Sequence, residues 1–231
     1  MKKYIHIFFD LDHTLWDFER NAEETKEELF EKYSLKSRGI ESYQLFREKY
    51  VPINTGLWDL YRENKIEKED LNFKRFYLTL CQFGIEDKVL GASMADDFIE
   101  GISEKTFLFP HATEILEYLY PKYLLYIITN GFEEVQYRKL AKSGMDKYFT
   151  KIITSEAAGS KKPDLEIFRY AFDLTGASLT ESIMIGDDPL VDIGGARSFG
   201  IDQLFVNFDR KLPSCGATFE VGSLLEIEDI L

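Results

Sequence analysis

Two aspartates, Asp10 and Asp12, follow an apolar run close to the start of the chain. Residues i and i+2 of an extended segment face the same side, so a strand ending here directs both carboxylates into one small volume. Such a pair brings a buried strand no packing advantage, whereas it suits a nucleophile beside a proton-exchanging group. The alternative is an acidic turn that caps the next helix, because Asp is a common N-cap residue.

The same pattern occurs twice more, as a β-branched run that ends in small polar or acidic residues. One run ends at Thr129-Asn130 and another at Gly186-Asp187-Asp188. Backbone amides at the start of a helix that follows such a strand can hold phosphate oxygens, and the Thr129 hydroxyl adds a donor. Three strand ends are therefore predicted to carry groups suited to a phosphate or a metal ion.

Elements that position these residues can be predicted from hydrophobic periodicity. Five apolar runs are typical of buried parallel strands, over residues 4–9, 124–129, 151–154, 182–185 and 203–206. Helical patterns accompany them over residues 112–120, 133–142, 164–175 and 191–199. This alternation predicts an α/β fold with an open, Rossmann-like parallel sheet. Ligands bind outside the carboxyl ends of such strands, so Asp10, Thr129 and Asp187 are expected along one edge.

The intervening stretch is different, with few strand-like runs and aromatic residues at helical spacing. Four amphipathic helices are predicted, with a break near Pro52, over residues 17–33, 42–62, 68–83 and 88–102. We therefore expect a catalytic core of residues 1–15 and 106–231 and an α-helical cap domain of residues 16–105. The joints are short, which favours a hinged lid over an independent domain.

Composition limits the classes of protein that remain. The 231 residues are 45% apolar and 15% aromatic, which is enough for a core domain and an insert. No apolar stretch approaches the roughly 20 residues of a membrane span, and the two cysteines lack metal-type spacing. The formal charge of −13 opposes binding to nucleic-acid polymers, whose affinity comes largely from Lys and Arg. We expect a cytoplasmic monomer or weak homodimer whose partner is a small molecule, with no membrane association.

Four short motifs follow one another along the chain. They are Asp10-Leu11-Asp12-His13-Thr14, Thr129-Asn130-Gly131, Lys162-Pro163-Asp164 and Gly186-Asp187-Asp188 with Asp192. In this order and at these separations they resemble the motifs of haloacid dehalogenase superfamily hydrolases with an α-helical cap. The resemblance spans nearly the full length of the chain. His13 is a departure, because Gly is commonest at that position in the family.

The chemistry of these residue types agrees with the resemblance. An aspartate can attack phosphorus to form an aspartyl-phosphate, which divides hydrolysis into two displacements. Asp10 is the predicted nucleophile, and Asp12 is predicted to protonate the leaving oxygen and later to accept a proton from water. Lys162 precedes a proline, so its backbone is biased away from helix and its ammonium can offset the charge of nucleophile and phosphate. Spacing alone does not separate Lys162 from Lys161.

A metal ion is expected because negative charges would otherwise accumulate. Two like unit charges about 4 Å apart repel by roughly 4 kcal/mol at an effective dielectric near 20. Hard, oxygen-ligated Mg²⁺ relieves this repulsion and orients the phosphoryl group. The resemblance implies ligation by the Asp10 and Asp187 side chains and the Asp12 main-chain carbonyl. Asp188 and Asp192 are expected nearby, as ligands or as partners of ligands, and a helix-start acid is the alternative for both.

Substrate choice is expected to depend on the helical insert. Residues 52–58, together with residues 15–18, are similar to the pyrimidine 5′-nucleotidase branch of the superfamily. An aromatic wall can stack on a base while an amide recognises its edge, so the candidate specificity residues are Phe18, Asn54 and Trp58. Packing within the cap is the alternative for the two aromatic residues. The resemblance implies a Mg²⁺-dependent phosphatase for small phosphomonoesters, with a nucleoside 5′-monophosphate as the expected substrate.

Other functions remain as alternatives. A sugar-phosphate or other metabolite phosphatase would use the same motifs. A haloacid dehalogenase hydrolyses a carbon ester and needs neither a metal nor a second acid, so Asp12 argues against it. A receiver-like signalling protein would carry its phosphoacceptor on the third strand and would lack the helical insert. A noncatalytic phosphate-binding protein would not release phosphate over many turnovers.

Overall fold

The computed structural model describes residues 4–231, and the chain divides into two compact units. The first unit contains the chain up to Glu19 and from Lys105 to the end, and the second contains Arg20–Glu104. The chain leaves the first unit within helix α1 (Phe18–Lys32) and returns just after helix α4 (Lys88–Ser103).

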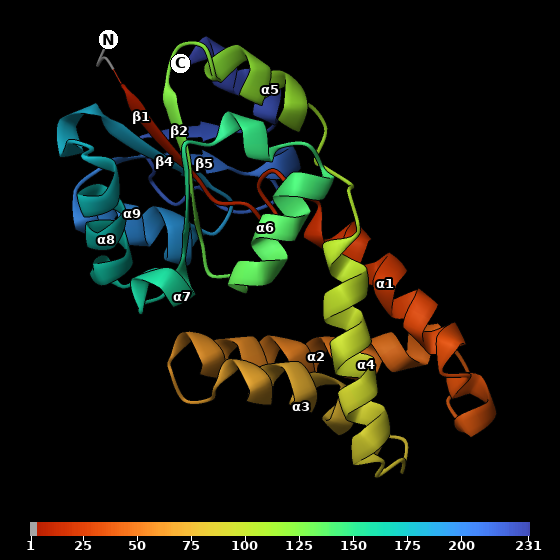
Figure 1. Ribbon diagram of the computed structural model, residues 1–231. Helices are drawn as coiled ribbons and strands as arrows, with labels where there is room; N and C mark the ends of the chain where they lie inside the picture. Colours follow the sequence, from red (N-terminus) through yellow and green to blue (C-terminus); the bar gives the residue numbers. More distant parts are fainter. Residues whose placement is uncertain (1–3) are drawn as a thin grey trace. The chain divides into compact units, whose positions relative to one another are not determined.

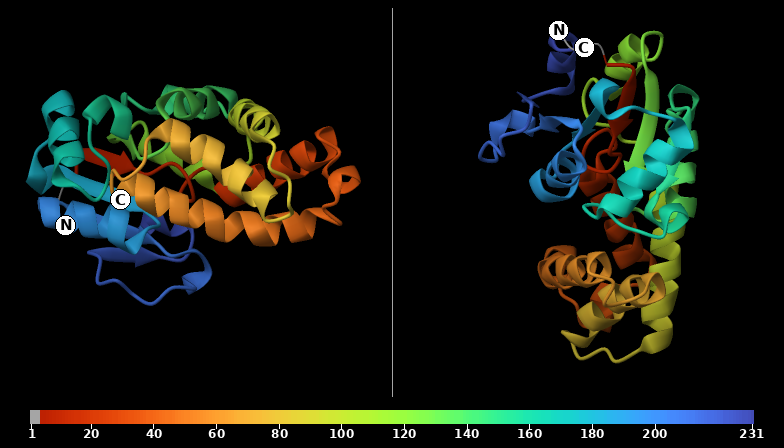
Figure 2. Two further views of the ribbon diagram at one scale, coloured as in Figure 1. Left: turned by 90° about the horizontal axis from the view of Figure 1, so that it is seen from below. Right: turned by 90° about the vertical axis from the view of Figure 1, so that its left-hand side faces the viewer.

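The first unit is built on a parallel sheet with the strand order β3-β2-β1-β4-β5-β6 (Figures 1 and 2). Its strands are β1 (His6–Phe9), β2 (Leu124–Thr129), β3 (Lys151–Thr154), β4 (Ser182–Gly186), β5 (Asp202–Val206) and β6 (Phe219–Val221). The predicted α/β, Rossmann-like fold is confirmed. Strand β6 was not predicted, because it is only three residues long and its middle residue is Glu220, so it forms no apolar run.

The register of the sheet brings the strand ends to one edge. Phe9 of β1 lies opposite Ile127 of β2 and Ile185 of β4, so the chain leaves β1 and β4 at the same level. Connections run outward in opposite directions from β1 and β4, which makes the space between their carboxyl ends the topological switch point of the sheet. This is where α/β sheets bind ligands.

Helices cover both faces of the sheet, because crossovers between parallel strands are right-handed. This rule places α5 and α6 on one face and α8 and α9 on the other. The second face has a core of Phe8, Tyr126 and Met184 against Phe168 of α8 and Ala196 of α9. The helices of this unit are α5 (Ala112–Leu119), α6 (Glu133–Lys142), α7 (Ser155–Ala158), α8 (Leu165–Thr175) and α9 (Gly195–Phe199). The other helical turns of this unit are η2 (Asp146–Tyr148), η3 (Leu179–Glu181), η4 (Pro189–Gly194), η5 (Phe208–Arg210) and η6 (Leu224–Asp229).

The helix predicted over residues 191–199 is in fact two segments. A π-helical turn, η4, begins at Pro189 and passes into the short α9 at Gly195. Adjacent glycines at 194 and 195 weaken a continuous α-helix, since Gly is about 1 kcal/mol less favourable than Ala there. Gly195 also permits close packing, because a Cβ atom there would lie 2.8 Å from the Phe168 ring.

The second unit is helical throughout its main elements. After α1 come the turn η1 (Leu35–Arg38), α2 (Tyr43–Arg62), α3 (Lys68–Cys81) and α4. The four predicted helices are present, but the break expected near Pro52 is not, because α2 continues through it. Buried Phe46 and Tyr50 before the proline and Leu57 and Tyr61 after it hold both halves of α2 in place. This packing offsets the backbone hydrogen bond that Pro52 cannot make.

Aromatic side chains form the core of the helical unit. The rings of Phe46 and Tyr50 stack at 5.9 Å, and Phe76 lies 5.3 Å from Tyr50 and 5.4 Å from Phe98. The guanidinium of buried Arg75 lies 4.5 Å from the centre of the Phe98 ring. Many of the aromatic residues at helical spacing therefore serve packing within this unit.

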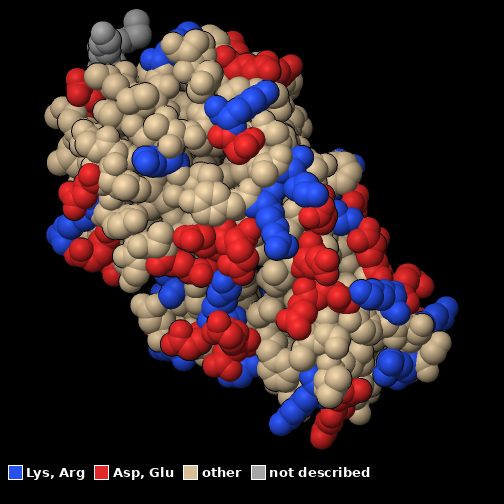
Figure 3. All heavy atoms as spheres, viewed as in Figure 1, with Lys and Arg blue, Asp and Glu red and all other residues tan. Residues whose placement is uncertain are grey.

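Surface features agree with the composition. Within residues 4–231, none of the helices is long and apolar enough to cross a bilayer. On the face shown in Figure 3, Lys and Arg side chains are interspersed with Asp and Glu rather than gathered in one basic area. Cys81 and Cys215 are both free thiols.

Candidate active site

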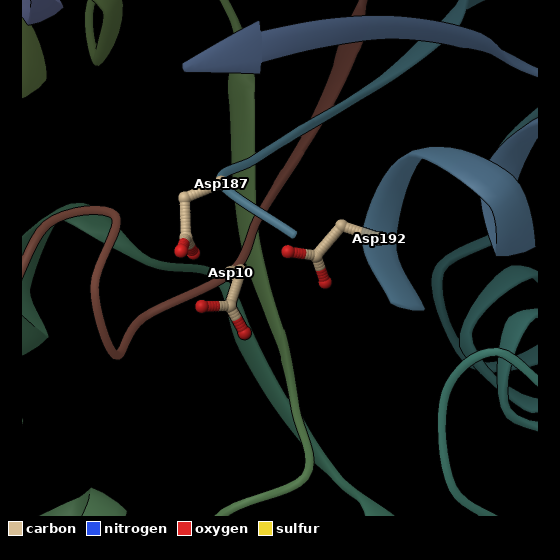
Figure 4. Close-up of side chains that lie close together, drawn as sticks. All are labelled: Asp10, Asp187 and Asp192. Atoms are coloured by element: carbon tan, nitrogen blue, oxygen red, sulfur yellow. The ribbon is translucent and has the colours of Figure 1, made fainter. Parts of the chain in front are cut away.

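Three carboxylates converge at the switch point of the sheet. Asp10 follows β1, Asp187 follows β4, and Asp192 lies in the η4 turn, and one oxygen from each lies within 4.8 Å of the others. Figure 4 shows the three carboxylates lying close together. Asp10 is 7% exposed and Asp192 is 2% exposed. A set of hard oxygen donors at such spacing suits a hydrated divalent cation such as Mg²⁺.

Lys162 is the lysine that reaches this cluster. Its Nζ donates to Asp10 Oδ1 at 2.6 Å, to Asp192 Oδ1 at 2.7 Å and to the Ile128 carbonyl at 2.7 Å. Only 1% of Lys162 is exposed, so all three ammonium hydrogens bond to buried acceptors. The contacts distinguish it from Lys161, which spacing alone could not do.

Asn130 holds the backbone of Lys162 from both sides. Its Nδ2 donates to the Lys162 carbonyl at 2.9 Å, and its Oδ1 accepts from the Lys162 amide at 2.8 Å. The side chain therefore orients the lysine loop. Phosphate binding by the backbone amide of Asn130 stays a prediction.

The electrostatics of the cluster show an excess of negative charge. Burial raises the pKa of Asp187 to about 8, with the charge of Asp192 adding to the shift and a 3.0 Å hydrogen bond from Thr14 opposing it. Burial also raises the pKa of Asp10 well above its usual range, although Lys162 acts in the other direction. Burial alone would lower the pKa of Lys162, but Asp10 and Asp192 outweigh it and raise the pKa. One ammonium cannot balance three carboxylates, and a divalent cation would favour their ionised forms.

The Asp12 side chain has a separate set of partners. Lys139 Nζ lies 2.6 Å from its Oδ1, and Gln136 Nε2 donates to its Oδ2 at 2.8 Å. Both partners lie on α6, three residues apart, on one buried face of the helix. We did not predict either of them. In the sequence, the only signal was that these two polar residues lie among apolar residues on the same face of the predicted helix. This pattern is common, so it did not single them out.

Thr129 ends β2, and its hydroxyl oxygen accepts two hydrogen bonds. Its Oγ1 accepts from the Gly131 amide at 3.0 Å and from Gln136 Nε2 at 2.7 Å, so both lone pairs are used. The hydroxyl hydrogen is then directed to another acceptor, and a phosphate oxygen is a suitable one. Gly131 permits this arrangement, because a Cβ atom there would lie 1.9 Å from Gln136 Nε2.

Asp188 lies beside the cluster but uses its side chain differently. Its Oδ1 accepts from the amides of Leu190 at 2.8 Å and Val191 at 2.9 Å, which makes it the N-cap of η4. Its own amide donates to Asp192 Oδ2 at 3.1 Å. The helix-start alternative therefore describes the Asp188 side chain, whereas Asp192 belongs to the carboxylate cluster.

The segment after Asp10 is a turn rather than an extended strand, which differs from our expectation. The amides of Leu15 and Trp16 both donate to the Leu11 carbonyl. His13 has a φ of 66°, in the left-handed region that Gly adopts without steric cost. Gly would adopt this conformation without that cost, and the His13 ring lies 5.1 Å from that of Phe18.

The three candidate specificity residues lie in different units. Phe18 belongs to the sheet unit, where its ring is 6.2 Å from that of Trp16. Asn54 and Trp58 belong to α2 of the helical unit and, being four residues apart, share one face. Both are half-buried, and Trp58 packs edge-on against Tyr61 at 5.7 Å.

Comparison with known proteins identifies similar sequences and folds. The family model described as "Haloacid dehalogenase-like hydrolase" matches residues 7–206. The pyrimidine 5′-nucleotidase PynA of Streptococcus pneumoniae is 32% identical over 232 residues, which cover 99% of this chain and 95% of that protein. The pyrimidine 5′-nucleotidase YjjG of Escherichia coli is 30% identical over 232 residues, covering 99% and 98%. The crystal structure of the HAD-hydrolase YfnB of Bacillus subtilis, bound to magnesium, matches with a TM-score of 0.90 at 31% identity, covering 100% and 99%.

Proposed function

Because the chain belongs to the haloacid dehalogenase-like hydrolase family, we propose that it is a Mg²⁺-dependent phosphatase that hydrolyses small phosphomonoesters through an aspartyl-phosphate. The observation that carries the proposal is the position of Asp10 at the switch point. Its carboxylate meets the Lys162 ammonium at 2.6 Å beside Asp187 and Asp192. Asp12 supplies the second acid that a phosphate ester needs and a haloacid does not.

In the first half-reaction, an Asp10 oxygen attacks phosphorus and the bond from phosphorus to the ester oxygen breaks. Asp12 gives its proton to the departing oxygen, so the alcohol leaves in neutral form. The Lys162 ammonium offsets the charge that Asp10 and the phosphoryl group bring together, and the Thr129 hydroxyl donates to a phosphoryl oxygen. The products of this step are the alcohol, phosphorylated Asp10 and ionised Asp12.

In the second half-reaction, a water oxygen attacks the same phosphorus. Asp12, now ionised, accepts a proton from the water, and the bond from phosphorus to the Asp10 oxygen breaks. Inorganic phosphate leaves, the Asp10 carboxylate is restored, and Asp12 is protonated for the next cycle. One residue therefore serves as acid and then as base.

The residues present fit a magnesium ion. Its proposed ligands are the side chains of Asp10 and Asp187 and the main-chain carbonyl of Asp12, with Asp192 close by. When bound, the ion supplies positive charge beside the phosphoryl oxygens. The excess of carboxylates over the single ammonium supports this assignment, as does the magnesium in the YfnB structure.

For the substrate we propose a nucleoside 5′-monophosphate, with a pyrimidine base favoured. The support is similarity over nearly the whole chain to PynA and YjjG, which are named for that activity. The helical unit is proposed to act as the cap. Trp58 of the helical unit and Phe18 of the sheet unit are the candidates for stacking on the base, and Asn54 of the helical unit is the candidate for recognising the base edge.

A phosphate-release screen tests reaction and substrate together. We expect turnover of p-nitrophenyl phosphate, UMP and dTMP with Mg²⁺, lower kcat/KM for AMP and UTP, and no turnover with EDTA. Full activity after exhaustive chelation would contradict the metal assignment. A sugar phosphate that exceeds every nucleotide by about tenfold, or about 1.4 kcal/mol, would remove the nucleotidase proposal and leave the phosphatase one.

The nucleophile has its own test. Asp10→Asn is expected to abolish turnover while the thermal unfolding transition is retained, because the amide cannot form the acyl phosphate. The loss corresponds to several kcal/mol of transition-state stabilisation. Asp146→Asn, which neutralises an exposed carboxylate of the same unit, is the control. Near-normal turnover by Asp10→Asn would assign the chemistry to another residue.

A further inference from the structure

Lys139 is a buried cation that lies outside the four motifs. It belongs to the last turn of α6 and is 2% exposed. Its Nζ lies 4.0 Å from the centre of the Trp16 ring and 5.2 Å from that of Phe18. Burying an ammonium is unfavourable unless it is paired, and here the paired charge is Asp12. The Trp16 and Phe18 rings add a cation–π attraction for the ammonium.

Lys139 and Gln136 together hold both oxygens of the Asp12 carboxylate. Lys139 bonds to Oδ1 and Gln136 to Oδ2, at 2.6 Å and 2.8 Å. An ionised carboxylate has about four acceptor sites, so about two remain for exchanging a proton. Gln136 also donates to Thr129, which ties the orientation of Asp12 to the predicted phosphate-binding hydroxyl.

We propose that Lys139, assisted by Gln136, is a positioning residue that orients the Asp12 carboxylate for proton transfer to the leaving group. The inference rests on the proposed phosphatase function. The alternative is an ion pair that only anchors the turn after Asp10 to α6. An anchor of that kind would affect all substrates equally, whereas a positioning role affects substrates according to their need for a proton.

Leaving groups distinguish these two roles. Phenolate is a poor leaving group and needs a proton as it departs, whereas p-nitrophenolate departs readily as an anion. Phenyl phosphate and p-nitrophenyl phosphate have nearly the same shape, so binding differs little between them. Because kcat/KM includes only the steps up to the first irreversible one, the ratio of the two kcat/KM values reports on proton donation during phosphoryl transfer to Asp10.

The test variant is Lys139→Met, which keeps an unbranched side chain against Trp16 and Phe18. We expect kcat/KM for phenyl phosphate to fall about tenfold or more and that for p-nitrophenyl phosphate to fall less than about threefold. Lys142→Met, at an exposed position on the same helix, is the control and should leave both values within about twofold. Equal losses on the two substrates, or no loss, would overturn the inference.

A double-mutant cycle with Asp12→Asn adds a second measure. If Lys139 acts through Asp12, Lys139→Met should change the ratio of the two kcat/KM values little in the Asp12→Asn background. The same change in both backgrounds would overturn the inference, because Lys139 would then act independently of Asp12.

Gln136→Met provides a further variant if Lys139→Met fails to fold. It removes the other donor to Asp12 and should shift the ratio of kcat/KM values in the same direction. A uniform loss in this variant would count against the inference. The wild type separates the two levels of the argument, since failure to release phosphate from either aryl ester would overturn the proposed function and the inference with it.

Discussion

Asp188 and Asp192 carry the same functional group four residues apart, yet their surroundings differ. Asp188 Oδ1 caps a helical turn through two backbone amides. Asp192 is 2% exposed, bonds to Lys162 at 2.7 Å and has an oxygen within the carboxylate cluster. The environment of each side chain, rather than its type, is therefore the basis for proposing that Asp192 and not Asp188 supports a metal ion.

Neutralising these two residues one at a time tests that difference. We expect Asp192→Asn to weaken Mg²⁺ binding about tenfold or more, because partners of metal ligands contribute on that scale. Asp188→Asn removes the same charge but keeps a good N-cap residue, so a change of less than about threefold is expected. Isothermal titration calorimetry gives both dissociation constants without an activity assay. Equal weakening by the two variants would show that net charge alone sets the affinity.

Individual residues also show where sequence reasoning was limited. Thr129, Lys162 and the aspartates could be predicted because motif order and strand ends place them together. Lys139 could not, because a lysine within an amphipathic helix is usually solvent-exposed, and only the packing of α6 reveals its burial. The His13 backbone conformation was likewise hidden, since an i, i+2 argument assumes an extended chain.

At the level of elements, strong hydrophobic runs were predicted accurately and weak ones were not. β2 and β3 have the predicted bounds because β-branched residues fill them, and α6 begins and ends where its periodicity does. β6 has no such run. The η4 turn and the uninterrupted α2 depend on tertiary packing around Gly195 and Pro52, which local propensity does not contain.

Helices α1 and α2 are joined by a charged contact at Glu23. Its carboxylate accepts from Tyr43 Oη at 2.6 Å and Arg47 Nε at 2.9 Å, and it pairs with Lys26. Burial acts to raise the pKa of Glu23, but hydrogen bonds from Lys26 and Tyr43 outweigh it and lower the pKa. A lowered pKa means that the carboxylate stabilises the fold above its ordinary pKa of 4.5, and that this contribution is lost as the pH falls through the lowered value.

Glu23→Gln should therefore destabilise the protein by about 1–2 kcal/mol near neutral pH. The difference from the wild type should stay nearly constant from about pH 7 to about pH 5 and then shrink as the pH falls below 4.5 and through the lowered pKa, because the carboxylate then takes up a proton. Urea unfolding at a series of pH values measures both effects. Glu27→Gln, at an exposed position on the same helix, should change stability by less than about 0.5 kcal/mol. A constant difference between Glu23→Gln and the wild type at every pH would contradict the assignment.

At the scale of the whole molecule, chemistry and substrate choice are proposed to reside in different units. The residues proposed to react all belong to the sheet unit. Lys162 and Lys139, which bond to Asp10 and Asp12, belong to the same unit. Asn54 and Trp58 belong to the helical unit. This division could be anticipated from composition, since the insert lacks strand-like runs, but the candidate specificity residues remain predictions from resemblance.

The division predicts that variants of the helical unit change selectivity without changing the reaction. Asn54→Ala and Trp58→Ala should each lower kcat/KM for UMP about tenfold, because a lost base contact is worth roughly 1–3 kcal/mol. The kcat/KM for p-nitrophenyl phosphate, which has no base, should stay within about threefold of the wild type. Leu60→Ala, at an exposed position of α2, is the control for loss of side-chain volume. If both substrates declined in parallel in the Asn54 and Trp58 variants, these residues would be assigned to packing of the helical unit, and the base would have to be recognised elsewhere.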